Sequence, residues 1–282
     1  MEEILKTLFL GIIQGLTEFL PVSSSGHLIL AETFLGVSEG TGGSSMLLEV
    51  ILHVATGIAV LYVFRKDIIN IIRGCVSKDT AERNGSLTYS GWVIAATIPA
   101  AVVGILFNDQ IDSLFDTSGG NKTPAYVASF MLLVTAGLLF YSSTRKGGDG
   151  KLTWAKAIAI GLIQAVAITP GISRSGSTIA MALILCVSRE EAGRFSFMLA
   201  LPAIFGAALL QARHVESWSS LLTPALIAGF IASFVVGIAA LKLLLTFIKK
   251  GKLYYFGYYC AAAAVVSLAC LTFLPSLTSS GS

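Results

Sequence analysis

Charged residues are scarce in this chain of 282 residues, where Lys, Arg, Asp and Glu together make up only 12%. A typical soluble domain carries about 25%. Hydrophobic residues reach 55%, and the mean hydropathy is +0.80. The sequence also lacks a long hydrophilic region, and residues 65–89 are the longest such piece. These absences exclude an ordinary soluble domain and predict an all-α polytopic membrane protein with a single membrane domain over residues 1–282.

Cysteine is also rare, and its spacing carries no metal or redox signature. The chain has four cysteines, none of which forms a CxxC pair, and three of them lie in apolar segments. We therefore expect packing roles for them. No cleavable signal peptide is expected, because the chain begins Met-Glu-Glu and the apolar stretch that follows belongs to an internal repeat.

Six apolar runs approach the ~20 residues that a helix needs to cross a bilayer. They predict membrane spans at residues 47–64, 90–107, 125–143, 195–212, 224–248 and 253–275. Two further apolar regions, at about 4–36 and 154–187, are interrupted by polar turns that contain Pro21 and Pro170. We predict that each is a re-entrant helical hairpin whose turn is buried in the bundle, because exposed backbone is not tolerated in lipid. The alternative is an ordinary span with a proline kink.

The two interrupted regions are copies of one another. Residues 11–26 align without a gap on residues 161–176, and six of the sixteen positions are identical. In hydrophobic proteins built from repeats, such broken polar segments usually form the functional site. The copies differ where chemistry is expected, because Glu18, Ser24 and His27 occur only in the first. The second has Arg174 in place of Ser24.

Charge placement predicts the orientation. If neither hairpin crosses the membrane, the loops at 65–89, 144–156, 188–194 and 249–252 share one side and hold fourteen Lys and Arg, against three opposite. This excess marks the cytoplasmic side, so both termini are expected to face outward. Residues 1–143 and 151–275 then each contain one hairpin and three spans. An odd number of crossings makes the halves antiparallel, which is an inverted-topology repeat.

Gln14 and Glu18 are four residues apart and point the same way on a helix. Burying a carboxylate in an apolar segment costs free energy and therefore indicates a functional role. The alternative is that Glu18 lies at the outer interface, where water solvates its carboxylate. One carboxylate, assisted by an amide oxygen and substrate phosphates, is enough for Mg²⁺. Glu49 is a weaker candidate ligand, because its position also suits an ordinary interfacial charge.

Small hydroxyl residues at each turn are typical caps of the returning helix. The N-termini of the two returning helices would point into the bundle and favour an anion. Arg174 adds a guanidinium suited to bidentate phosphate binding. The predicted diphosphate-binding residues are Ser23, Ser25, Gly26, Ser173, Arg174, Ser175, Gly176 and Thr178. Capping alone explains the serines but not a buried arginine.

Ser24 and His27 are three residues apart and lie within one helical turn of each other. A serine beside a histidine can act as a nucleophile with the histidine as base, or the histidine can itself attack phosphorus. The sequence leaves these alternatives open. It also leaves a packing role open for His27.

These residues carry a family resemblance. The stretches Gln14-Gly-Leu-Thr-Glu-Phe-Leu-Pro-Val-Ser-Ser-Ser-Gly-His27 and Pro170-Gly-Ile-Ser-Arg-Ser-Gly-Ser-Thr178 resemble the two signature motifs of the undecaprenyl-diphosphate phosphatase family, the bacitracin-resistance type of integral membrane enzyme. The likeness extends over essentially the whole chain. It implies hydrolysis of a polyprenyl diphosphate to the monophosphate lipid carrier at the outer face, with Mg²⁺ or Ca²⁺.

The resemblance also implies roles for particular residues. The acidic motif falls on Gln14 and Glu18, and the catalytic hydroxyl and imidazole fall on Ser24 and His27. The phosphate-binding motif falls on Ser173, Arg174, Ser175 and Thr178. Both Glu and Gln occur in the family at the position of Gln14. The glutamine here means one potential anionic ligand fewer, which affects the affinity for metal.

Two other classes of function compete with an enzyme. A lipid-phosphate flippase or another transporter also uses inverted repeats and broken helices. Such a carrier needs only binding groups in both halves, whereas here Ser24, His27 and Glu18 lie in one half and Arg174 in the other. A purely structural membrane protein leaves the ionisable residues at depth unexplained. The sequence does not determine the prenyl chain length, the cation or the oligomeric state. A homo-oligomer is one of the possible states.

Overall fold

The structure is a computed structural model that describes residues 2–35, 43–107, 110–111, 113, 121–145, 148, 150–213 and 223–273. The side chains of Glu32, Leu35 and residues 43–46 are not described. The last residue of the predicted first hairpin, residue 36, and the predicted end of the last span, residues 274–275, lie outside these ranges.

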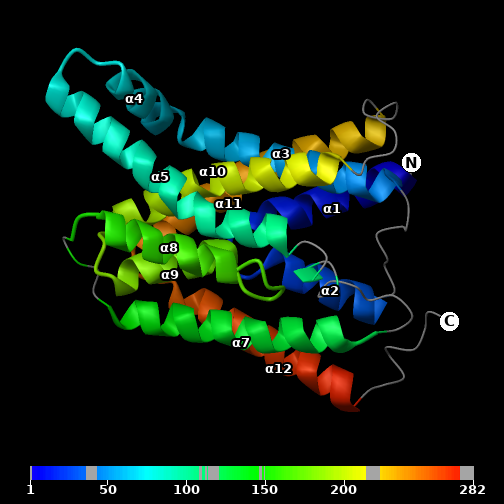
Figure 1. Ribbon diagram of the computed structural model, residues 1–282. Coiled ribbons are helices and arrows are strands. Elements are labelled where there is room, and N and C mark those ends of the chain that lie inside the picture. The colour runs from blue at the N-terminus through cyan, green and yellow to red at the C-terminus, as the bar shows by residue number, and fades with distance from the viewer. Residues whose placement is uncertain are drawn as a thin grey trace.

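The described part of the chain is built from helices, with a single isolated β-bridge between Gly150 and Val187. The helices are α1 (Glu2–Phe19), α2 (Ser24–Leu35), α3 (Gly43–Val63), α4 (Arg65–Cys75), α5 (Thr80–Leu106), α7 (Thr123–Thr144), α8 (Trp154–Val166), α9 (Arg174–Ile184), α10 (Arg189–Ala212), α11 (Pro224–Lys249) and α12 (Tyr254–Phe273) (Figure 1).

The predicted membrane class is confirmed by length and composition. Five described helices, α5, α7, α10, α11 and α12, are long and apolar enough to cross a membrane. Residues Leu47–Val63 of α3 pass the same test together with α4, although the chain bends by 72° between them. These six positions match the six predicted spans.

The 65–89 region differs from the plain connection that the sequence suggested. It folds into α4 and the first turns of α5, so α5 begins at Thr80 rather than at the predicted residue 90. The Asp79 side chain caps α5 by accepting hydrogen bonds from the backbone N–H groups of Ala81 and Glu82. The apolar side chains of Ile68 and Ile71 pack α4 against the core, which stabilises a helix in an otherwise polar stretch.

Two pairs of short helices enter the bundle from opposite ends (Figure 1). Helix α1 runs inward from the end where the N-terminus lies, and α2 returns toward that end. Helices α8 and α9 do the same from the end near α4. At 13 and 11 residues, α8 and α9 reach about 20 Å and 17 Å, less than the ~30 Å hydrocarbon core. Their re-entrant placement in a bilayer stays a prediction.

Small residues let the inward helices pack closely on long ones. A Cβ atom added to Gly11 of α1 would collide with the carbonyl group of Gly229 in α11. A Cβ atom on Gly161 of α8, the repeat partner of Gly11, would collide with that of Ala96 in α5. Close approach of this kind is how helices associate in lipid, where apolar burial gives little driving force. The two crossings fix where the turns after α1 and α8 lie.

Candidate active site

The turn after α1 (residues 20–23) and the turn after α8 (residues 167–173) lie against each other at the centre of the bundle. A Cβ atom on Gly26 would come within 2.9 Å of the Gly171 Cα atom, and one on Gly176 within 3.0 Å of the Pro21 Cβ atom. The repeat alignment pairs Gly26 with Gly176 and Pro21 with Gly171, so these two contacts are equivalent. The two polar turns that the sequence singled out are therefore in direct contact.

A serine caps each returning helix, as the sequence predicts. The Ser23 hydroxyl accepts a hydrogen bond from the Gly26 N–H group at 3.2 Å, and the Ser173 hydroxyl accepts one from the Gly176 N–H group at 3.1 Å. The first residues of α2 and α9 have no intrahelical acceptor for their N–H groups, which leaves a partial positive charge at both helix starts. Ser23 takes a left-handed backbone conformation, with φ of 67°.

Thr135 of α7 holds the second turn in place. Its hydroxyl donates to the Gly171 carbonyl at 3.0 Å and accepts from the Ser173 N–H group at 3.1 Å. The side chain is fully buried. Sequence reasoning missed this residue, because the only signal was one hydroxyl within an apolar span.

A polar pocket of about 120 Å³ opens between the two turns. This volume exceeds the ~10–15 Å³ that a single water needs. The lining residues are Thr17, Glu18, Ser23, Ser24, Ser25, Ala167, Ile172, Ser173 and Arg174. Ser24 and Arg174 are the first residues of α2 and α9 and occupy equivalent repeat positions. The Ser24 hydroxyl makes no hydrogen bond to the described residues, so it is free to act in the pocket.

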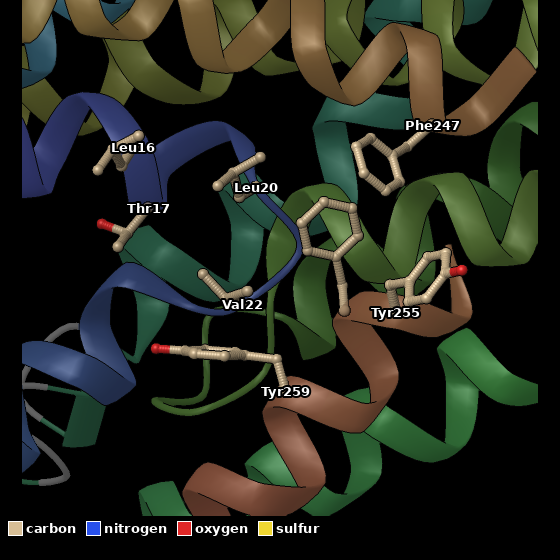
Figure 2. A pocket seen from close by; sticks show the side chains of 8 residues that line it. Leu16, Thr17, Leu20, Val22, Phe247, Tyr255 and Tyr259 are labelled. Carbon is tan, nitrogen blue, oxygen red and sulfur yellow. The ribbon is translucent and has the colours of Figure 1, made fainter. Parts of the chain in front are cut away.

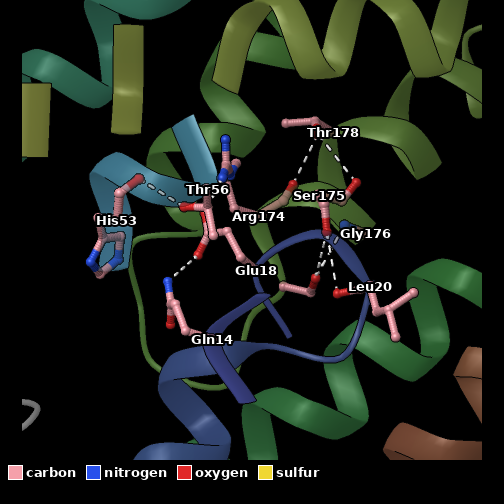
Figure 3. Close-up of polar contacts among 10 residues, drawn as sticks. Gln14, Glu18, Leu20, His53, Thr56, Arg174, Ser175, Gly176 and Thr178 are labelled. Atoms are coloured by element: carbon pink, nitrogen blue, oxygen red, sulfur yellow. Dashed lines mark hydrogen bonds and ion pairs between the residues drawn. The ribbon is translucent and has the colours of Figure 1, made fainter. Parts of the chain in front are cut away.

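An ion pair joins the two turns across the pocket. The Arg174 Nη2 atom lies 2.5 Å from the Glu18 Oε1 atom, and the Gln14 amide donates to Glu18 Oε2 at 3.2 Å (Figure 3). The Glu18 side chain is only 9% exposed. The buried Nη1 atom of Arg174 has no partner among the described residues. One face of the guanidinium is therefore available to an incoming anion, which such a buried donor requires.

His27 lies beside the pocket rather than in its wall. Its Nδ1 atom contacts the Ser23 carbonyl at 2.8 Å, and its Nε2 atom contacts the Tyr259 hydroxyl at 2.8 Å. Ser24 and His27, which lie within one helical turn of each other, make no hydrogen bond to one another in the described part of the chain, where both ring nitrogens have other partners. Tyr259 is a second residue that sequence reasoning missed.

An apolar groove adjoins the polar pocket (Figure 2). It has a volume of about 580 Å³, within the ~300–1,000 Å³ typical of ligand pockets. The residues that line it are Leu16, Thr17, Leu20, Val22, Phe247, Tyr255, Phe256 and Tyr259. Thr17 lines both the groove and the polar pocket, so the two spaces meet at this residue.

The remaining predicted site residues lie outside the pocket wall. Gln14 contacts the pocket only through its hydrogen bond to Glu18. Gly26 and Gly176 have no side chain and therefore allow the two turns to come into contact. Ser175 bonds to the Leu20 carbonyl at 3.5 Å, and the Thr178 hydroxyl donates to the Arg174 carbonyl at 2.9 Å within α9. None of these five residues lines the polar pocket, and their contacts hold the residues that do.

Glu49, the weaker candidate ligand, is elsewhere. Its carboxylate accepts a hydrogen bond from the Gln211 amide at 2.7 Å, between α3 and α10. Neither residue lines the polar pocket.

The pocket residues fit a cation only in part. No group of three or more His, Cys, Asp or Glu side chains that could hold a metal ion occurs in the described part of the chain. Both oxygens of Glu18 already have partners. Glu18 and the Gln14 amide oxygen still provide the single carboxylate and neutral oxygen that Mg²⁺ accepts when phosphates and waters complete its shell.

Comparison with known proteins identifies the family of the chain. The sequence profile described as Bacitracin resistance protein BacA matches residues 7–266. The chain is 40% identical to an undecaprenyl-diphosphatase of Christiangramia forsetii, over 96% of this chain and 98% of that one. It is 37% identical to an undecaprenyl-diphosphatase of Methanosphaera stadtmanae, over 95% and 98%. A Bacteroides fragilis protein of the same name is 38% identical, over 93% and 96%. The protein therefore belongs to the bacitracin-resistance BacA family.

Proposed function

We propose that this protein is a membrane-bound undecaprenyl-diphosphatase, which hydrolyses undecaprenyl diphosphate to the monophosphate and inorganic phosphate. The observation that carries the proposal is the polar pocket between the two turns, where Ser24, Glu18 and Arg174 meet beside two helix N-termini. The family and the names of its curated relatives agree with this reaction. It would recycle the cell-wall lipid carrier and confer resistance to bacitracin. Nothing in the comparisons favours the flippase alternative.

The two adjoining spaces suit the two parts of such a substrate. The polar pocket takes the diphosphate, whose charge is offset by Arg174 and by the partial positive charges of the α2 and α9 N-termini. The apolar groove takes the prenyl units nearest to the diphosphate, while the rest of the tail stays in lipid. Thr17 marks the boundary between them.

Ser24 is the proposed nucleophile, because its hydroxyl faces the pocket without another partner. Its oxygen attacks the terminal phosphorus, the bond to the bridging oxygen breaks, and undecaprenyl monophosphate leaves. Water then hydrolyses the phosphoserine to inorganic phosphate. His27, one helical turn away, is the proposed base: it takes the Ser24 proton, passes it to the departing monophosphate, and then takes a proton from the attacking water. Arg174 stabilises the charge on the phosphoryl oxygens, an effect that is large in a water-poor site.

A divalent cation, Mg²⁺ or Ca²⁺, would be held by Glu18 and Gln14 together with substrate phosphates. It would neutralise phosphate charge and orient the terminal phosphoryl group. Glu18 already pairs with Arg174, so we expect cation binding to depend on the substrate, which provides the missing anionic ligands.

The proposed orientation puts the site at the outer face. The α1 and α2 end of the bundle carries the N-terminus, and the α4 end carries most of the lysines and arginines. The excess of positive charge supports a cytoplasmic location for the α4 end. The two helix pairs that enter from opposite ends then form an inverted repeat in the plasma membrane, with both termini outside.

The proposal is tested by phosphate release from undecaprenyl diphosphate by the purified protein in detergent. The wild type and the Ser24→Ala, His27→Ala and Arg174→Ala variants are compared with Mg²⁺, with Ca²⁺ and with EDTA. We expect cation-dependent release by the wild type and losses of at least about 100-fold in all three variants.

Arg145→Ala provides the matched control, because Arg145 is a solvent-exposed arginine outside the pocket. Its activity should equal that of the wild type. Absence of release by a well-folded wild type that still binds the lipid would refute the proposal.

A further inference from the structure

The surroundings of His27 join the reaction site to the apolar groove. One ring nitrogen contacts the Ser23 carbonyl oxygen, and the other contacts the Tyr259 hydroxyl, each at 2.8 Å. The Tyr259 ring also stacks on the imidazole, with ring centroids 5.5 Å apart and an interplanar angle of 11°. Tyr259 thus contacts the histidine through a hydrogen bond between two nearly parallel rings.

The partners of the imidazole determine where its proton lies. A carbonyl oxygen only accepts, so the Nδ1 atom must carry a hydrogen and donate it to Ser23. The neutral ring then has its lone pair on Nε2, which accepts from the Tyr259 hydroxyl. When the ring gains a proton there, the same hydroxyl can rotate and accept from it. A phenol oxygen is therefore a partner for both protonation states of His27.

Tyr259 is itself held in position by its helix. The neighbouring Cys260 thiol lies 3.4 Å from the Pro21 carbonyl oxygen, so α12 packs directly on the first turn. The Tyr259 ring forms part of the wall of the apolar groove and is 49% exposed (Figure 2). The hydroxyl of Tyr259 therefore contacts the imidazole, and the ring remains open to a ligand in the groove.

We propose that Tyr259 is a positioning residue that holds the ring of His27 in its orientation through the Nε2 atom and also contacts the prenyl tail of the substrate. This inference rests on the proposed phosphatase function. In this inference the Tyr259 hydroxyl affects the rate of the reaction, and the Tyr259 ring affects the binding of the lipid. A single side chain would then link the binding of lipid in the groove to the orientation of His27, the proposed base.

The two assignments are separated by kinetics on undecaprenyl diphosphate. Tyr259→Phe keeps the ring and removes the hydroxyl, so kcat should fall about tenfold, part of the ~10²–10⁴-fold that a general base contributes. Its KM should stay within about twofold, because the groove wall is kept. Tyr259→Leu removes both features, so kcat should fall and KM should also rise. Tyr258→Phe, which changes a neighbouring exposed tyrosine outside the groove, should behave as the wild type.

A spectroscopic measurement tests the positioning role independently of turnover. Nitrogen NMR of protein labelled with ¹⁵N-histidine, with His27 identified by its loss in His27→Asn, reports which ring nitrogen carries the proton and whether the other nitrogen accepts a hydrogen bond. We expect the Nδ1–H tautomer in the wild type and in both tyrosine variants, because the Ser23 carbonyl accepts from Nδ1. The Nε2 resonance should be unchanged in Tyr258→Phe but shifted in Tyr259→Phe, where the hydroxyl donor is lost.

The outcomes separate this inference from the function on which it rests. A folded wild type that releases no phosphate overturns the phosphatase function. An active wild type whose Tyr259→Phe variant keeps its kcat overturns the role of Tyr259. A lower kcat with an unchanged His27 signal also overturns it, because Tyr259 would then act by another route. If Tyr259→Phe does not fold, the Nε2 resonance is measured on Tyr259→Leu, and a wild-type signal there refutes the inference.

Discussion

The turn after α1 and the turn after α8 use the same backbone design for different chemistry. Each has a serine cap, a glycine three residues later and a contact between two serine hydroxyls, at 3.4 Å in the first and 3.3 Å in the second. The residue after the cap differs, because Ser24 provides a hydroxyl and Arg174 a guanidinium. The shared features place two helix N-termini beside one pocket. The residue that differs gives the pocket a hydroxyl from the first half and a positive charge from the second.

The helices that lead into the turns differ in the same way. Gln14 of α1 bonds to Glu18, whereas its repeat partner Gln164 is 2% exposed and has no hydrogen-bond partner among the described residues. The reason is the neighbour four residues on, which is Glu18 in the first copy and Ile168 in the second. The second copy therefore has the amide without the carboxylate.

A substitution that makes the second turn like the first should have the largest effect on phosphate release. Arg174→Ser gives the second turn the residue of the first, and the charge that offsets the diphosphate is lost. We expect kcat/KM for phosphate release to fall about 1,000-fold, the upper end for one such donor. Far-ultraviolet circular dichroism should be unchanged, since serine suits the first position of α2. Arg145→Ser is the control, and an equal loss in both variants would contradict the account.

The contact between the turns should be almost as sensitive. Gly26→Ala forces a Cβ atom to 2.9 Å from the backbone of Gly171, and Gly176→Ala forces one to 3.0 Å from Pro21. We expect each variant to lose about 1–3 kcal/mol of stability through overpacking. Phosphate release should fall with it, because the pocket widens.

Gly137→Ala is the control for this pair, because a Cβ atom there meets nothing within 4 Å. Alanine should raise the stability of α7 slightly. Thermal unfolding in detergent measures all three variants, and equal melting temperatures for Gly26→Ala and Gly137→Ala would show that the turns do not touch.

The two glutamines should respond in opposite directions. Gln14→Leu removes the hydrogen bond to the buried Glu18 carboxylate, so kcat/KM should fall about tenfold, the size of a bond to a charged group. Gln164→Leu removes a buried amide without partners, which costs about 1–3 kcal/mol while unpaired. Its activity should be kept and its melting temperature kept or raised. Similar losses in both variants would mean that Gln164 has a role of its own.

The smallest effect is expected at the two caps. Ser23 has a φ of 67°, a conformation that glycine adopts without strain, whereas the φ of Ser173 is −72°. Ser23→Gly should therefore be close to neutral, because relief of strain offsets the lost cap. Ser173→Gly should lose about 0.5–1 kcal/mol. Chemical denaturation in detergent measures the difference, and a larger loss in Ser23→Gly would contradict this reading of the turn.

The sequence was sufficient to locate the spans, the two broken regions and the site. Polar groups in apolar runs are costly, so Glu18 and Arg174 stand out without a structure. The contacts of Thr135 and Tyr259 were not predictable, because they join segments far apart in the chain. The partner of the His27 Nε2 atom was not predictable for the same reason, because Tyr259 comes from α12, far along the chain. Helix α4 was missed because its apolar residues are interspersed with charges.

The account centres on one site assembled from both turns through Glu18 and Arg174. The most direct test is a double-mutant cycle in kcat/KM for phosphate release, with Glu18→Gln, Arg174→Gln and the two combined. Residues that act as a unit are not additive. We therefore predict that the double variant loses about as much as the worse single variant. Losses that multiply would show that Glu18 and Arg174 act separately, and would contradict a single site shared by the two halves.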